Sequence, residues 1–379
     1  MNLINVKRKL LNYYINSRGW KTKRRIIVIQ SDDWGSIRTP TEKVLQTLKK
    51  EGFPVEKNPY IRFDALESNE DLRSLINTLK QFKDFKGRHP IVTANIIVTN
   101  PNFYEIKKAG YSKYFYEPFT ETLRRFPNRD QVINLYHEGI NQGVLHPQLH
   151  GFTHVNITRW LKSLKEGNKI TRRLFELGMY DLSDSQTQIS ENSFVDALNV
   201  ENLEDLSRQQ KELETASQIF EEIFGYKSAT FIAPCYTWRP ELEKKLSDLK
   251  IKSIQTGVFQ SIPLFKKENQ FKKKIHYTGK TNKYKTTYLV RNCFFEPSLN
   301  EKAFTIESCL KQIQNAFKNQ KPAIISSHRL NFIGFIDEKN RINNLILLKN
   351  LLSLILKKWP DVEFMNSVEL GSLILNESI

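Results

Sequence analysis

The sequence of 379 residues contains few cysteines and no long apolar run. Its three cysteines, Cys235, Cys293 and Cys309, include no CxxC pair, so the sequence predicts neither a disulfide framework nor a thiolate zinc site. No segment approaches the roughly 18 consecutive apolar residues of a membrane-spanning helix, and the N-terminus lacks the apolar segment and cleavage site of a secretory signal. We therefore expect a cytoplasmic protein with reduced thiols.

Acidic residues are scarce relative to basic ones, since 58 Lys and Arg stand against 41 Asp and Glu and give a formal net charge of +17. Such a charge favours contact with polyanions or anionic lipid surfaces. Nucleic acid is disfavoured as the partner, because no zinc-finger spacing, RNP-like aromatic motif or glycine-rich phosphate loop accompanies the charge. The oligomeric state is not predicted by any feature of the sequence.

The first residues predict a separate element. In residues 3–16 the apolar side chains fall on adjoining rows of a helix, and Lys7, Arg8 and Lys9 flank them, as in an amphipathic basic helix. Such a helix could lie on the inner face of an anionic membrane or could cover the fold. We therefore divide the chain into an N-terminal basic helix, residues 1–23, and a single domain, residues 24–379.

The rest of the chain alternates between strand and helix patterns. Short β-branched runs predict buried strands at 25–30, 91–98, 230–232, 251–255, 286–295, 323–327 and 362–364, and apolar periodicity predicts helices at 68–82, 129–142, 202–224, 240–249, 303–318 and 341–358. This alternation predicts a mainly parallel α/β barrel or sheet. Two insertions are expected, near 100–128 and 155–195, and the segment 103–127 within the first is interpreted as an elaborated loop.

Histidine is concentrated in one short segment. Three of the seven histidines, His146, His150 and His154, lie within residues 145–154, directly after a strand-like run. Two imidazoles separated by four residues can converge on one divalent ion, because each offers a neutral ring nitrogen. The segment therefore predicts part of a metal site.

Other chemically active side chains also follow predicted strands. Asp32 and Asp33 come directly after the strand at 25–30, and His328 ends the strand at 323–327. Active sites of α/β folds are built at this end of the strands, although a helix cap or turn would explain the aspartates and a buried structural histidine would explain His328. One aspartate with two histidines is an incomplete zinc shell, and a further acid and histidine can move protons. These are the parts of a metal-assisted amide or ester hydrolase.

The order of these residues resembles that of the polysaccharide deacetylases of the NodB-homology type, over about residues 24 to 370. Ser31-Asp32-Asp33 is similar to their first motif and His150-Gly151-Phe152-Thr153-His154 to their second. Ala233-Pro234-Cys235-Tyr236 is similar to their third motif and Ser327-His328 to their last. The resemblance implies a distorted (β/α) barrel and a divergent, metal-dependent carbohydrate deacetylase that acts on non-peptide C–N amide bonds.

The resemblance also implies residue roles. Asp33, His150 and His154 would bind Zn²⁺ or another divalent transition metal, Asp32 would be the general base and His328 the general acid. The substrate would be an N-acetylated amino sugar in a polysaccharide or glycan precursor, as in surface polysaccharide biosynthesis. An O-acetyl esterase would use the same residues.

The sequence departs from the family pattern in two places. The third motif usually supplies an arginine that orients the base, but Ala233 stands near that position, and Arg38, Arg239 and Arg329 are candidates to replace it. An Asp-and-Trp motif between the third and last motifs is not evident. These departures favour the alternative of a catalytically silent barrel that binds a glycan or a lipid.

Residues beside the motifs are candidates for substrate contact. Trp34, Phe152 and Trp238 could stack on sugar rings or form apolar walls of a barrel, and Arg329 is expected to contact the substrate. His146 could support a metal ligand by hydrogen bonding or could be a structural histidine.

Overall fold

The structure is a computed structural model that describes residues 17–182, 193–265, 270–299 and 304–377. The N-terminal helix predicted at residues 3–16 lies outside the described residues. Within them, none of the helices has an apolar stretch long enough to cross a membrane.

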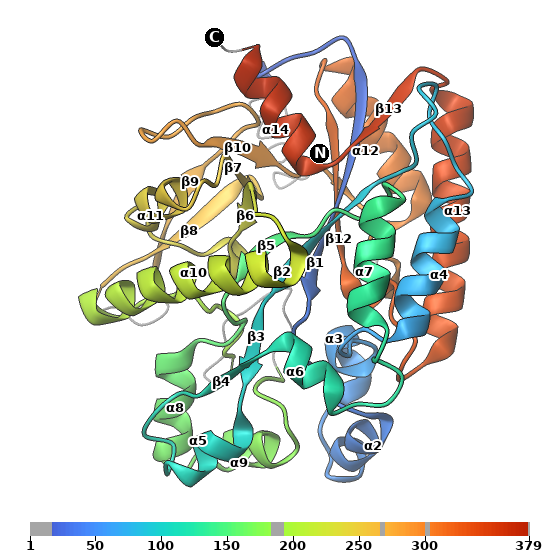
Figure 1. The fold of residues 1–379 in the computed structure, drawn as a ribbon. Coiled ribbons are helices and arrows are strands. Elements are labelled where there is room, and N and C mark those ends of the chain that lie inside the picture. Colours follow the sequence, from blue (N-terminus) through green and yellow to red (C-terminus); the bar gives the residue numbers. More distant parts are fainter. Residues whose placement is uncertain (1–16, 183–192, 266–269, 300–303, 378–379) are drawn as a thin grey trace, which may run out of the picture.

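A central sheet of nine strands dominates the fold (Figure 1). Its strand pairs are parallel, and the order is β10-β7-β6-β5-β2-β1-β12-β11, with β13 paired to the first half of β1. The strands are β1 (Arg25–Trp34), β2 (Val92–Ile97), β5 (Gln148–Gly151), β6 (Thr230–Ile232), β7 (Ser253–Thr256), β10 (Thr287–Val290), β11 (Cys293–Phe294), β12 (Ala323–His328) and β13 (Val362–Met365).

The two edges of this sheet meet in one run of chain. Strand β10 pairs with β7, β11 pairs with β12, and only Arg291 and Asn292 separate β10 from β11. The backbone N–H of Arg291 donates to the Thr256 carbonyl at 2.9 Å, and that of Asn292 donates to the Ile324 carbonyl at 3.1 Å. The segment 287–294 therefore closes the sheet, and the predicted distorted (β/α) barrel is confirmed.

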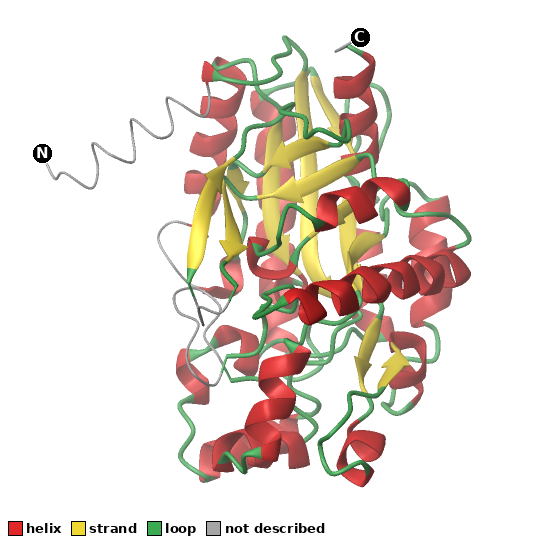
Figure 2. Cartoon of the chain, turned by 90° about the vertical axis from the view of Figure 1, so that its left-hand side faces the viewer, coloured by secondary structure: helices red, strands yellow, loops and turns green. Residues whose placement is uncertain are grey.

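Helices surround the sheet (Figure 2). One group consists of α4 (Asn69–Leu79), α7 (Val132–Asn141), α12 (Ile306–Lys318) and α13 (Glu338–Lys358), and another of α10 (Leu203–Phe224) and α11 (Leu242–Asp248). Local sequence sets their ends: Ser68 and Asp71 form a capping box at the start of α4, and Gly225, with φ of +77°, ends α10. Helix α14 (Ser367–Asn376) packs on β1, β7 and β10.

The interior of the barrel is partly polar. The Nδ2 of Asn95 donates to Oε1 of Gln255 at 2.9 Å, and Nε2 of Gln255 donates to Oγ1 of Thr230 at 2.8 Å. All three side chains are fully buried, so each would destabilise the fold without these partners. Asn95 also donates to Asp32 at 2.7 Å, which links the interior to the carboxyl ends of the strands.

The two segments predicted as insertions contain helices and strands where described, and the prediction of a loop at 103–127 is wrong. This part of the chain contains β3 (Thr99–Pro101), α5 (Phe103–Lys108), β4 (Tyr116–Pro118) and α6 (Phe119–Arg124), and the second insertion contains α8 (Ile157–Lys165) and α9 (Lys169–Glu176). Trp160 packs against Phe103 and Phe175, with ring centroids 5.9 and 5.6 Å away. The two insertions therefore share a small aromatic core, which single-segment periodicity does not predict.

Further short elements were also not predicted. They are α2 (Glu42–Lys50), α3 (Pro59–Arg62) and an antiparallel hairpin of β8 (Phe259–Pro263) and β9 (Phe271–Ile275). The hairpin is separate from the main sheet. Strand β9 contains three consecutive lysines, a residue type that is depleted in strands, so propensity gave no signal for it.

Candidate active site

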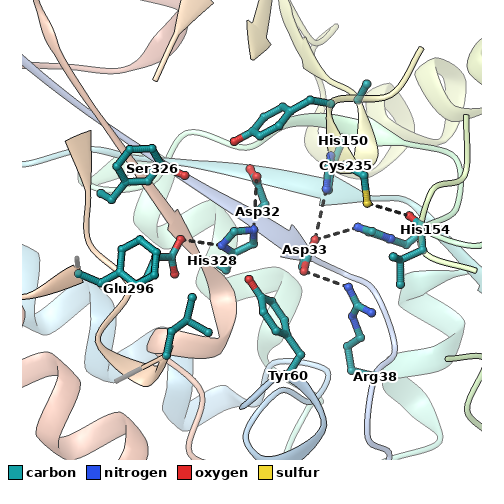
Figure 3. A pocket seen from close by; sticks show the side chains of 16 residues that line it. Asp32, Asp33, Arg38, Tyr60, His150, His154, Cys235, Glu296, Ser326 and His328 are labelled. Atoms are coloured by element: carbon teal, nitrogen blue, oxygen red, sulfur yellow. Dashed lines mark hydrogen bonds and ion pairs between the residues drawn. The ribbon is translucent and has the colours of Figure 1, made fainter. Parts of the chain in front are cut away.

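A cavity of about 450 Å³ opens at the carboxyl ends of the barrel strands (Figure 3). It contains all five residues for which a metal-binding or catalytic role was predicted. The lining residues are Asp32, Asp33, Arg38, Tyr60, His150, His154, Val195, Ala233, Cys235, Tyr236, Phe294, Glu296, Leu299, Phe304, Ser326 and His328. The fold therefore brings together side chains that lie almost 300 residues apart in sequence, as their predicted positions at the ends of strands indicated.

A bulge in β1 turns both aspartates toward this cavity. Successive side chains of a regular strand point to opposite faces, which would separate Asp32 from Asp33. Here the pairing of β1 with β2 shifts register between Ser31 and Trp34, and Asp33 has a φ of +73°. Aspartate tolerates this left-handed conformation better than most residues. The bulge thus places two adjacent carboxylates in one site.

Asp33, His150 and His154 form a buried cluster. Oδ1 of Asp33 lies 3.3 Å from Nε2 of His150 and 3.1 Å from Nε2 of His154 (Figure 3). One potential ligand atom of each residue lies within 4.8 Å of the other two. The three residues can therefore hold a single metal ion. Among the described residues, this is the one group of His, Cys, Asp or Glu side chains close enough together to do so.

The hydrogen bonds around the cluster favour a cation at its centre. Nδ1 of His150 lies 3.0 Å from the Ile232 carbonyl, which can only accept, so Nδ1 carries a proton and Nε2 is the nitrogen that faces Asp33. Burial lowers the pKa of His154, and this effect outweighs the opposing influence of Asp33, so His154 is neutral at neutral pH. Its Nδ1 has no hydrogen-bond partner among the described residues. A carboxylate facing two imidazole nitrogens is a donor set that suits zinc.

Arg291 holds Asp32. Its Nη1 and Nη2 each lie 2.6 Å from one oxygen of the Asp32 carboxylate, and its Nε donates to Gln30 at 2.8 Å. Burial alone would raise the pKa of Asp32, but the guanidinium outweighs burial and the pKa lies at about 2. Asp32 is therefore ionised, and the bidentate contact fixes the plane of its carboxylate.

His328 lies on the other side of Asp32. The two residues are partners in the parallel register of β1 and β12, and Nε2 of His328 is 3.9 Å from Oδ2 of Asp32. Nδ1 of His328 lies 2.6 Å from Oε1 of Glu296, whose other oxygen accepts from Asn331. Burial would lower the pKa of His328, but Glu296 outweighs it and raises the pKa to about 9. His328 is therefore protonated at neutral pH.

Arg38 contacts the opposite oxygen of Asp33. Its Nη2 lies 3.3 Å from Oδ2 of Asp33, and its guanidinium lies 5.9 and 5.7 Å from the rings of Tyr60 and Tyr180. Burial raises the pKa of Asp33 less than the surrounding histidines and Arg38 lower it, so the pKa of this carboxyl lies well below its usual range. Arg38 thus contacts one oxygen of the Asp33 carboxylate, and the other oxygen, Oδ1, faces His150 and His154.

The four predicted substrate contacts lie outside the lining of the cavity. Trp34 and Trp238 are 0% and 1% exposed, and Arg329 is fully buried between Asp64 and Glu67. Phe152 is 6% exposed and packs on Tyr116. None of these four side chains lines the cavity. They are wall or core residues, because a side chain without exposed surface cannot stack on a sugar.

The supporting role predicted for His146 is also wrong. Its backbone N–H donates to Val92, at the amino end of β2, and its ring stacks on Tyr226 with centroids 5.7 Å apart. This position is at the opposite end of the strands from Asp33. Of the arginines proposed to orient Asp32, Arg239 binds Glu241 and Pro263, and Arg38 and Arg329 contact other acids.

Arg291 and Glu296 are site residues that were not predicted from the sequence. Glu296 directly follows the predicted strand at 286–295, so the rule that identified Asp32 and His328 applied to it too. Arg291 lies inside that predicted strand, which the structure divides into β10 and β11, so the rule did not identify it. The family pattern directed attention to positions near the third motif instead. Tyr60 was missed because it comes from α3, a four-residue helix without a sequence signal.

No curated protein matches the chain. Among solved structures, a 4-alpha-glucanotransferase from Thermococcus litoralis is 10% identical with a TM-score of 0.46, and the alignment covers 92% of this chain and 40% of that one. A putative polysaccharide deacetylase from Mycobacterium smegmatis is 10% identical with a TM-score of 0.45, covering 96% and 94%. A putative glycoside hydrolase/deacetylase from Parabacteroides distasonis is 8% identical with a TM-score of 0.48, covering 93% and 71%.

One family model matches the chain, with the description glycosyl hydrolase family 57, over residues 38–298. The matched segment contains His150, His154, Arg291 and Glu296. Asp32, Asp33 and His328 lie outside it. Because the match extends over more than half of the sequence, the chain belongs to glycosyl hydrolase family 57, a family of enzymes that act on carbohydrates.

Proposed function

We propose that the protein is a metal-dependent hydrolase that removes N-acetyl groups from an amino sugar in a polysaccharide or glycan precursor. The observation that carries this proposal is the buried cluster of Asp33, His150 and His154, which lies in the same cavity as an ionised Asp32 and a protonated His328. Membership of a carbohydrate-active family supports a sugar as the substrate.

The cluster fits a divalent ion such as Zn²⁺. Two neutral imidazole nitrogens and one carboxylate oxygen are the protein ligands of many catalytic zinc sites. A bound ion would supply a Lewis acid beside the carbonyl of the acetamide. The proton transfers would be carried out by side chains of the protein itself.

Asp32 and His328 would divide the proton transfers. Asp32 is ionised at neutral pH, so it can accept the proton of the attacking water, and Arg291 keeps its carboxylate in one orientation. His328 carries a proton up to about pH 9, so it can donate that proton to the departing amine. Amide hydrolysis needs this donation, because an unprotonated amide nitrogen is a poor leaving group.

Cleavage of a glycosidic bond is the second candidate, and the family match favours it. Such cleavage commonly uses two carboxyl groups, one of which must stay protonated near neutral pH to act as the acid. In this cavity the pKa of both Asp32 and Asp33 lies below the usual range. Neither aspartate therefore supplies an acid of this type. The third carboxyl group of the cavity, Glu296, is paired with His328, so we favour deacetylation.

The test compares acetate release with metal content. Purified protein loaded with Zn²⁺ is assayed for acetate and for new reducing ends on N-acetylated oligosaccharides. We expect acetate without new reducing ends. His150→Gln should bind metal at least tenfold more weakly, since it removes one ligand, whereas Asp32→Asn should keep the metal and lose activity by orders of magnitude.

His146→Gln is the matched control, since His146 lies four residues before His150 and at the other end of the barrel. It should keep both metal and activity. Release of reducing ends without acetate would establish the glycosidase instead. Wild-type protein that binds no divalent metal by titration calorimetry would overturn the proposal.

A further inference from the structure

The net positive charge of the chain comes from two short segments. Residues 1–25 contain eight Lys and Arg and no acidic residue. Residues 250–285 contain ten lysines and one acidic residue, Glu268. The remaining residues hold 40 basic and 40 acidic side chains, so they contribute no net charge. Positive charge that is concentrated in two segments indicates a local binding function, whereas charge needed only for solubility can be spread over the whole surface.

The two segments meet in the fold. The backbone N–H of Trp20 donates to the Thr278 carbonyl at 2.9 Å, and a Cβ on Gly19 would lie only 2.2 Å from the same oxygen. Residues 17–20 therefore pack closely on the turn that follows β9. This contact places the two basic segments side by side. What we call the basic face is the set of lysines from both segments, on either side of β9, and consists of Lys21, Lys23, Lys272, Lys273, Lys274, Lys280, Lys283 and Lys285.

The lysines of the basic face are not neutralised by acids. Lys273 and Lys280 donate to neutral oxygens of Ser261 and Ile275, and within the described residues no carboxylate forms an ion pair with any of the eight. In contrast, Lys244 and Lys245 on the adjacent helix α11 pair with Asp248 and Glu214. Mutual repulsion on the basic face costs stability, and an anionic partner would relieve it.

Aromatic side chains lie among these lysines. Phe259 on β8 is 39% exposed. The ammonium group of Lys280 lies 5.6 Å from the ring centre of Tyr277, and that of Lys283 lies 5.0 Å from the ring centre of Tyr284. Amphipathic rings beside lysines are typical of surfaces that lie in the headgroup region of a bilayer.

Lysine is the sole basic residue type in residues 250–285, which contain no arginine. Arginine is favoured where nucleic acid is recognised, because its flat guanidinium binds bases and phosphates in a bidentate way, whereas attraction to a charged lipid surface requires only point charges. The amphipathic basic pattern of residues 3–16 precedes Ser17 directly in sequence and is also typical of membrane contact. We propose that the basic face binds the surface of a membrane that contains anionic phospholipids.

The test uses the full-length protein and sedimentation with vesicles. Wild type should bind vesicles of equimolar phosphatidylcholine and phosphatidylglycerol, should not bind vesicles of phosphatidylcholine alone, and should lose binding as salt is raised. Each lysine near an anionic surface contributes on the order of a fivefold factor in partitioning, so a Lys272→Gln, Lys273→Gln, Lys274→Gln variant should bind roughly 100-fold more weakly.

A matched variant removes the same charge elsewhere. Lys162→Gln, Lys165→Gln, Lys169→Gln changes three exposed lysines of α8 and α9, and it should bind nearly as well as wild type. Circular dichroism and thermal midpoints of both variants check that the fold is retained. Equal losses in the two variants, failure of wild type to bind the anionic vesicles, or tighter binding to duplex DNA at the same salt would each overturn the proposal.

Discussion

The imidazole of His328 lies between two carboxylates, and the nearer one controls its proton. Glu296 is 2.6 Å from Nδ1, whereas Asp32 is 3.9 Å from Nε2 and is already neutralised by Arg291. The pair of Glu296 and His328 therefore holds a proton beside Asp32, and the charge of His328 adds to the influence of Arg291 that lowers the pKa of Asp32. Histidine alone, with an ordinary pKa of about 6.5, would be mostly neutral at physiological pH.

Replacing Glu296 by glutamine tests this coupling. His328 then loses the carboxylate that raises its pKa to about 9, so it should lose its proton at a lower pH. Because the acid is active only when protonated, the alkaline limb of the kcat profile should move downward by at least one pH unit, with activity at pH 6 much less affected. The measurement is kcat for acetate release across pH.

Glu338→Gln provides the comparison, since Glu338 is 68% exposed on α13. Its profile should coincide with that of wild type. An alkaline limb that stays in place in Glu296→Gln would remove His328 as the group responsible.

The site residues at strand ends could be predicted from the sequence, whereas the residues that form hydrogen bonds with them could not. Asp32, Asp33 and His328 follow strongly apolar runs, which mark strand ends clearly. The pairing of Arg291 with Asp32 depends on barrel closure between segments about 260 residues apart. The predicted substrate contacts of Trp34 and Trp238 failed because sequence proximity to a motif does not determine on which face of the strand or loop a side chain lies.

The bulge at the end of β1 is the element on which the metal cluster depends. Asp33 and Gly35 both have positive φ, of +73° and +78°. The backbone N–H of Gly35 donates to Glu67, and its carbonyl accepts from Asn100. A Cβ on Gly35 would lie 2.4 Å from the Ile97 carbonyl of the neighbouring strand. Close backbone packing thus fixes the turn two residues from Asp33, a candidate metal ligand.

Gly35→Ala should therefore damage stability and metal binding together. The positive φ and the clash with Ile97 should lower the free energy of unfolding by about 2 to 4 kcal/mol. Relief of the clash would displace Asp33, so zinc affinity should fall as well. Denaturant unfolding and competition with a chelating dye measure the two effects.

Gly52→Ala is the matched control, because Gly52 has a φ of +83° but no atom within 4 Å of the added Cβ. It should cost about 1 kcal/mol and leave zinc affinity unchanged. If the two variants behave alike, the close packing at Gly35 has no role in positioning Asp33.

Elements were predictable where the sequence pattern is local. The strand predicted at 230–232 has the same bounds as β6. The helix predicted at 202–224 begins one residue before α10, and both of its ends were predictable because Asn202 caps the helix and Gly225 ends it. The hairpins β3–β4 and β8–β9 and the helices of the insertions were missed. Their stability comes from contacts with other segments, such as the packing of Trp160 on Phe103.

At the scale of the whole molecule, a charged cluster joins three distant segments. Glu363 on β13 accepts two hydrogen bonds from Arg24, at 2.8 and 2.6 Å, and forms an ion pair with Lys86 at 2.7 Å. The side chain of Glu363 is only 6% exposed. The bond from Arg24 lowers the pKa of Glu363 to about 2. The cluster fastens β13 beside the first half of β1.

Glu363→Gln should destabilise the fold in a pH-dependent way. The depressed pKa contributes stability that is present above the ordinary value of 4.5 and is lost as the pH falls towards 2. The variant should be about 1 to 3 kcal/mol less stable at pH 7, with the difference disappearing near pH 2. Urea unfolding at a series of pH values measures this.

Glu70→Gln removes an exposed ion pair with Arg73 and should change stability by less than about 0.5 kcal/mol at any pH. A difference between Glu363→Gln and wild type that persists unchanged at low pH would contradict the role of the charge.

The closure of the barrel at residues 287–294 has a consequence for the order in which the site is built during synthesis. All three candidate metal ligands have been synthesised once residue 154 is made, whereas Arg291, Glu296 and His328 belong to the last quarter of the chain. A nascent or truncated chain can therefore contain the three candidate ligands and Asp32 before Arg291, Glu296 and His328 exist. On the proposed function, binding of the ion and the start of turnover would therefore be separate events, joined only when the final strands of the barrel are translated.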